Sequence, residues 1–131
     1  MHHRLLLQTP TLSVEYDVID DFIRATWAPD QTVDTIRSGY ELLLGKLQRV
    51  HCHRLLDDPR HIHGLWADLA VWVATDWYPR ARAAGLTVHA VIYATDFYGR
   101  RSTELALQRV GGGLIAGFDS EEAAIRALLE L

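Results

Sequence analysis

The sequence has a single cysteine and no long hydrophobic run. Because Cys52 is alone, no disulfide can form within the chain, and such cysteine usage is typical of a reducing compartment. The longest apolar runs, such as residues 69–74, are far shorter than the roughly 20 residues that cross a bilayer. The basic start Met1–Arg4 is followed by too short an apolar stretch for a secretory signal. We therefore expect a cytoplasmic protein with no membrane partner.

An excess of positive charge is also lacking. The formal net charge is −4, whereas a protein that binds a phosphate backbone normally presents a basic face. We therefore expect no nucleic-acid partner. An apolar fraction of 49% and a charged fraction of 23% are ordinary for a globular protein. A length of 131 residues is close to the commonest domain size, which predicts a single domain over residues 1–131.

The N-terminal part of the chain has the pattern of an antiparallel hairpin. Apolar and polar residues alternate from Leu12 to Asp17, which is the period of a half-buried strand. Asp20 and Asp21 supply a turn, and Phe22–Trp27 forms the second strand. A short edge strand is expected over residues 5–9, before Pro10.

The rest of the sequence alternates between helical and strand patterns. An apolar stripe at steps of three and four predicts a helix over residues 33–50. Further helices are expected at 65–77, with a break at Pro79 and one more turn at 80–84, at 102–110 and after 119. Strands are expected at 54–58, 88–94 and 114–118. This order predicts an α/β fold with a mostly parallel sheet, the antiparallel hairpin at one edge and about four helices.

The same order of elements resembles the STAS fold of sulfate transporters and anti-sigma-factor antagonists. The chain is similar to a family of small bacterial STAS-like proteins at Val14–Asp17, Ile23–Trp27, Leu55–Arg60, Trp77–Arg80 with Gly85, and Phe118–Ala123. The resemblance implies a non-enzymatic interaction or regulatory module that works without a cofactor. We expect it to form a homodimer and to contact a further protein partner. The loop over residues 57–63 contains no serine or threonine, so it lacks the hydroxyl that phosphorylated STAS domains carry there.

A small-molecule or metal site at the carboxyl edge of the sheet is the alternative. Open α/β sheets bind ligands where parallel strands end, and acids, an arginine and histidines follow the strands there. The candidate ligand-binding residues are Asp57, Asp58, Arg60, His61, His63 and Asp96. The competing interpretation is a simple turn at Asp58-Pro59, capped by its own carboxylate. A hydrolase is a third hypothesis and has only this pairing of acids with histidines behind it.

Two further residues have open roles. Trp72 lies about a third of a turn from the apolar stripe of its expected helix, so it either packs at the margin of the core or forms an exposed interface anchor. His89 lies inside a strand that is expected to be buried. A hydrogen-bonded core histidine is the favoured interpretation there, ahead of a catalytic group.

Overall fold

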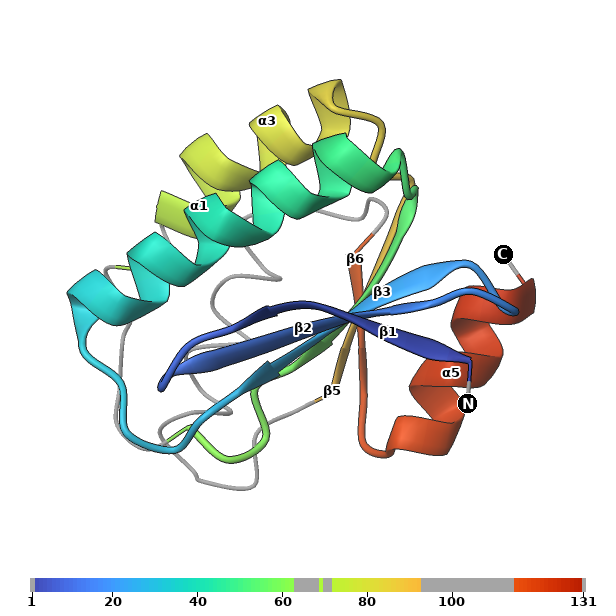
Figure 1. Ribbon diagram of the computed structural model, residues 1–131, viewed down its shortest axis with the longest axis horizontal. Coiled ribbons are helices and arrows are strands. Elements are labelled where there is room, and N and C mark those ends of the chain that lie inside the picture. The colour runs from blue at the N-terminus through green and yellow to red at the C-terminus, as the bar shows by residue number, and fades with distance from the viewer. Residues whose placement is uncertain (1, 63–68, 70–71, 93–114, 131) are drawn as a thin grey trace.

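A six-stranded sheet forms the centre of the protein. The structure is a computed structural model that describes residues 2–62, 69, 72–92 and 115–130. The strands lie side by side in sequence order: β1 (His3–Gln8), β2 (Leu12–Asp17), β3 (Phe22–Trp27), β4 (Arg54–Asp58), β5 (Val88–Ile92) and β6 (Ile115–Phe118). Helices α1 (Val33–Val50) and α3 (Tyr78–Ala83) cover one face, and α5 (Glu121–Glu130) covers the other (Figure 1).

The sheet is mixed in direction. The pairs β1–β2 and β2–β3 are antiparallel, whereas the strands from β3 to β6 are parallel to one another. The predicted hairpin is confirmed as β2 and β3, with Asp17 opposite Phe22 next to the turn. The edge strand next to the hairpin is β1, which begins at His3, earlier than the sequence pattern indicates. The parallel strands end at one common edge, which is the edge where the candidate site is expected.

Helix α1 follows its sequence pattern closely. The Thr32 hydroxyl accepts a hydrogen bond from the Thr35 backbone at 3.1 Å, and the Thr35 hydroxyl accepts one from the Thr32 backbone at 2.8 Å. This reciprocal arrangement satisfies two amide groups that the first turn leaves without helical partners. The four central positions of the predicted stripe, Ile36, Tyr40, Leu43 and Leu47, are buried. At the two ends of the stripe, Val33 is half exposed and Val50 is partly buried.

Two hydrophobic cores lie on opposite faces of the sheet. The larger core joins the α1 and α3 face to β2, β3 and β4 and includes Trp27 and Trp77, both of which are inaccessible to solvent. The smaller core packs Ala124 and Leu128 of α5 against Leu56 and its neighbours. Within the described residues no helix combines the length and the apolar character needed to cross a membrane.

The expectation of about four helices is wrong, because the described residues contain three α-helices. The expected break at Pro79 is also absent. A π-helical turn, η1 (Val73–Trp77), leads directly into α3, and the Tyr78 N–H closes it by donating to the Val73 carbonyl. Pro79 therefore lies in the first turn of α3, where its missing N–H costs little. The helix expected at 102–110 lies outside the described residues.

Candidate functional site at the carboxyl edge

The two acids at the end of β4 point to opposite faces of the sheet. Successive side chains of a strand alternate between faces, and Leu55 belongs to the larger core whereas Leu56 belongs to the smaller one. Asp57 therefore faces α1 and Asp58 faces α5, and both are 1% exposed. The structure does not bring these two carboxylates into one pocket.

Asp57 is the centre of a buried hydrogen-bonded group that we call the Asp57 cluster. Its Oδ1 accepts from Trp27 Nε1 at 2.7 Å, and its Oδ2 accepts from the Tyr40 hydroxyl at 2.9 Å. His89 Nε2 lies 3.0 Å from the same Oδ2. The three partners come from β3, α1 and β5, so one carboxylate holds two neighbouring strands and a helix to the end of β4. A buried charge requires such compensation.

Protonation within the Asp57 cluster follows from these contacts. Burial raises the pKa of Tyr40 well above its usual value, and the nearby charge of Asp57 raises it further. Tyr40 is therefore a hydrogen-bond donor at any ordinary pH. Because a carboxylate only accepts, the short contact to His89 assigns the hydrogen to Nε2. In the neutral imidazole Nδ1 is then an acceptor, and this buried atom has no hydrogen-bond partner within the described part of the chain.

On the other face, Asp58 belongs to an ionic group that we call the Asp58 cluster. Arg60 forms a two-pronged contact with it, from Nε at 2.9 Å and from Nη2 at 2.8 Å, and Arg24 Nη2 approaches at 3.1 Å. Both arginines also pair with Glu121 at the start of α5. Two guanidinium groups and two carboxylates give the cluster no net charge. It links β3 and the loop after β4 to the first turn of α5.

Electrostatics favour the ionised form of both acids in this cluster. Burial alone would raise the pKa of Asp58, but the hydrogen bonds and charge of Arg60 outweigh burial and lower it. The hydrogen bond from Arg24 likewise lowers the pKa of Glu121. In turn, the contact with Asp58 raises the pKa of Arg60. The acids and arginines of the cluster therefore stabilise one another in their charged forms.

The remaining predicted site residues are dispersed or lie outside the described residues. The His61 side chain is exposed in the turn after β4, while His63 and Asp96 are not among the described residues. Trp72 is half-buried and packs against α1, with its ring centroid 6.4 Å from that of Tyr40 and the Arg37 guanidinium 5.4 Å from its ring. Of the two roles open for Trp72, the structure places it at the margin of the core.

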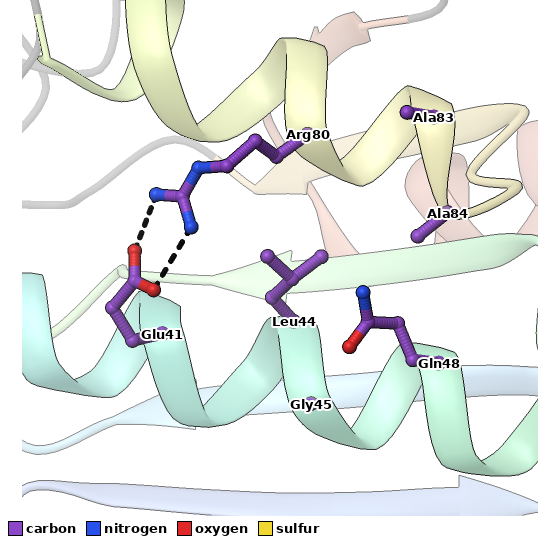
Figure 2. Close-up of a pocket in the computed structure, with 7 residues that line it drawn as sticks. All are labelled: Glu41, Leu44, Gly45, Gln48, Arg80, Ala83 and Ala84. Carbon is purple, nitrogen blue, oxygen red and sulfur yellow. Dashed lines mark hydrogen bonds and ion pairs between the residues drawn. The ribbon is translucent and has the colours of Figure 1, made fainter.

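An open groove runs along the outer surface between α1 and α3, away from both acids of β4. Figure 2 shows Leu44 and Gln48 on the α1 side, Ala83 and Ala84 on the α3 side, and Arg80 reaching across to Glu41. The groove has a volume of about 550 Å³. Arg80 also pairs with Asp76 at 2.6 Å, and the pKa of Glu41 is lowered by its hydrogen bond from Arg80. The ion pair ties the two helices together across the groove.

Sequence reasoning missed the partners of both acids. Nothing in the local sequence links Trp27, Tyr40 and His89 to one carboxylate, because the parallel pairing of β3, β4 and β5 and the packing of α1 on the sheet bring them together. One signal lies in strand geometry: two adjacent residues that are both inside a strand face opposite sides of the sheet, which argues against a common ligand for Asp57 and Asp58. Comparisons of the chain with known protein families, with curated proteins and with solved structures give no match.

Proposed function

We propose that the protein is a non-enzymatic, STAS-like interaction module that pairs with a second copy of itself through β1. The observation that supports this proposal is the position of β1, which has β2 as its only neighbour in the described part of the sheet. An edge strand presents unpaired backbone groups to a partner chain. Leu5, in the middle of β1, also presents an apolar side chain that is 55% exposed.

The pairing of β1 with β2 identifies which backbone groups point outward. The Val18 N–H donates to the His2 carbonyl at 2.9 Å, so His2 and Val18 are the opposing residues of a hydrogen-bonded pair. Such pairs alternate with pairs whose N–H and C=O groups point away from each other. Leu5 lies opposite Glu15, three residues after His2 and directly before an irregularity in the register between Leu5 and Leu7. Leu5 and Glu15 therefore form a pair whose N–H and C=O groups point away from each other. The N–H and C=O of Leu5 face the open side of β1, available to another strand.

A proline at position 5 tests this edge. The Leu5→Pro substitution removes one outward N–H and no hydrogen bond to β2, which is the arrangement in which an edge strand tolerates proline. We expect light scattering to give twice the 14.8 kDa chain mass for the unsubstituted protein and the single mass for Leu5→Pro. Circular dichroism should show that both are folded.

The control is Leu129→Ser, which removes an exposed apolar side chain from α5 instead of from β1. This variant should remain dimeric. An unsubstituted protein that is monomeric at all concentrations would overturn the proposal, as would a Leu5→Pro variant that remains dimeric.

A second candidate function is small-molecule binding beside His89. The supporting observation is that Nδ1 of His89, a histidine that is 2% exposed and is held in orientation by Asp57, has no hydrogen-bond partner among the described residues. A free acceptor in a buried place suits a ligand that donates an O–H or N–H group. Asp57 would position the imidazole and would not itself touch the ligand.

The test of this candidate is a thermal-shift screen with alcohols, amides and sugars, followed by ¹⁵N NMR of the histidine side chain. A binding compound should raise the melting temperature and shift the His89 Nδ1 resonance. In His89→Gln, whose amide can still donate to Asp57, the thermal shift should disappear. If no compound moves the His89 resonance, this candidate is rejected and the dimer proposal is unaffected.

A further inference from the structure

Two histidines and a buried aspartate meet at the opposite end of the sheet, where β1 begins and β2 ends. One donor atom from each of His2, His3 and Asp17 lies within 4.8 Å of the other two. His2 Nε2 is 3.2 Å from Asp17 Oδ2, and the two imidazole centroids are 4.3 Å apart. No other group of three potential metal ligands occurs within the described residues.

From this geometry we infer a binding site for one divalent transition-metal ion of the zinc class. Zinc bonds of about 2.0–2.1 Å in a tetrahedron place neighbouring ligand atoms about 3.3 Å apart. The separation of His2 and Asp17 matches this spacing. The third donor, from the exposed His3, lies within 4.8 Å of the other two and has to move closer to complete the ligand set. Imidazole nitrogens with a carboxylate oxygen are a ligand set that suits zinc and its neighbours in the transition series.

The carboxylate is oriented in advance. Asp17 is 4% exposed, and its Oδ1 accepts from the backbone N–H groups of Ile19 at 3.0 Å and Asp20 at 2.9 Å. These bonds hold the side chain with Oδ2 directed toward the histidines. Hydrogen bonds of this kind around a metal ligand fix its orientation and increase affinity.

The backbone positions of the histidines are also fixed by the sheet. His3 lies directly opposite Asp17 in the β1–β2 ladder, and the His2 carbonyl accepts from the Val18 N–H. The ion would thus join the edge strand to its neighbour. Three protein ligands leave a fourth tetrahedral position for water. This site does not depend on the proposed dimer or on the Asp57 cluster.

Calorimetric titration of the untagged, chelator-treated chain with zinc chloride tests the site. We expect one ion per chain, and a rise in melting temperature with zinc concentration because only the folded chain has the site assembled. His2→Ala and His3→Ala should each weaken binding at least tenfold. Asp17→Asn should do the same, since it keeps an Oδ1 acceptor for the two backbone amides and replaces Oδ2 with a nitrogen that cannot bind the ion.

The control is His51→Asn, which removes an exposed histidine at the end of α1 and keeps a residue that tolerates its positive φ of 57°. Its zinc affinity should be unchanged. The site is overturned if zinc does not bind, if the ratio is one ion per two chains, or if the exposed His3→Ala variant retains full affinity. Loss of binding in His61→Ala alone would place the ion in the loop after β4 instead.

Discussion

Two glycines of α1 show how the same residue type has opposite consequences at different positions. Gly39 faces the sheet, and a Cβ atom built there would lie 2.5 Å and 2.7 Å from two ring atoms of Trp27. That ring is fully buried, and its Nε1 is bonded to Asp57. Gly45 is exposed on the same helix, and a Cβ atom there would meet nothing within 4 Å.

Alanine substitution at these two positions should therefore change stability in opposite directions. Gly39→Ala forces Trp27 to move in a packed core and is expected to lower the free energy of unfolding by about 1–3 kcal/mol. Gly45→Ala should raise it by about 0.5–1 kcal/mol, because glycine is a poor helix former. Urea unfolding of both variants measures the difference. Equal effects at the two positions would contradict the close contact between α1 and Trp27.

At the scale of whole elements, the sequence predicted what depends on local pattern. The limits of Arg54–Asp58 and the buried stripe of α1 agree with the structure because hydrophobic period and turn residues are local signals. The π-helical turn before Pro79 could not be predicted, since the helical pattern of 65–77 does not distinguish bonding to the fourth residue from bonding to the fifth. The Asp58 cluster was missed for a different reason. Glu121 is far from Arg24 in the chain and meets it only when α5 folds back.

The attachment of α5 through the Asp58 cluster should weaken at acid pH. The pKa of Asp58 is lowered in the folded chain, so its contribution to stability is complete above the unfolded value of 3.8 and is lost as pH falls through the folded value. Asp58→Asn removes the buried negative charge that pairs with Arg24 and Arg60. We expect the free energy of unfolding to fall by about 3 kcal/mol at pH 7. This loss should shrink as pH falls below 3.8 and through the lowered folded pKa, where the native acid also becomes protonated.

Urea unfolding from pH 7 to pH 2.5 measures this convergence. Asp30→Asn is the control, because it neutralises an exposed loop carboxyl outside the cluster. A difference between Asp58→Asn and the unsubstituted chain that stays constant with pH would contradict the assigned role of the Asp58 carboxylate.

For the molecule as a whole, the two faces of the sheet are covered unequally. The long helix α1 packs with η1 and α3 on one side, while in the described residues α5 alone covers the other (Figure 1). Arginines hold both ends of α5. Arg24 and Arg60 pair with Glu121 in its first turn, and Arg54 donates to the Leu128 carbonyl near its end at 3.0 Å. The small core beneath α5 thus has polar attachments on either side.

Arg54 connects three parts of the chain, so its replacement should affect more than one element. Besides Leu128, it donates to the carbonyl oxygens of Asp20 at 2.5 Å and Asp21 at 3.1 Å, in the turn between β2 and β3. Lysine keeps the charge but has no planar fork that reaches three acceptors. Arg54→Lys is therefore expected to lower the free energy of unfolding by about 2 kcal/mol. Hydrogen exchange should speed up both in the last turn of α5 and in the β2–β3 turn.

The control is Arg49→Lys, at an exposed position in α1, which should leave hydrogen exchange in both regions unchanged. If Arg54→Lys accelerated exchange in α5 alone, Arg54 would not couple the two regions.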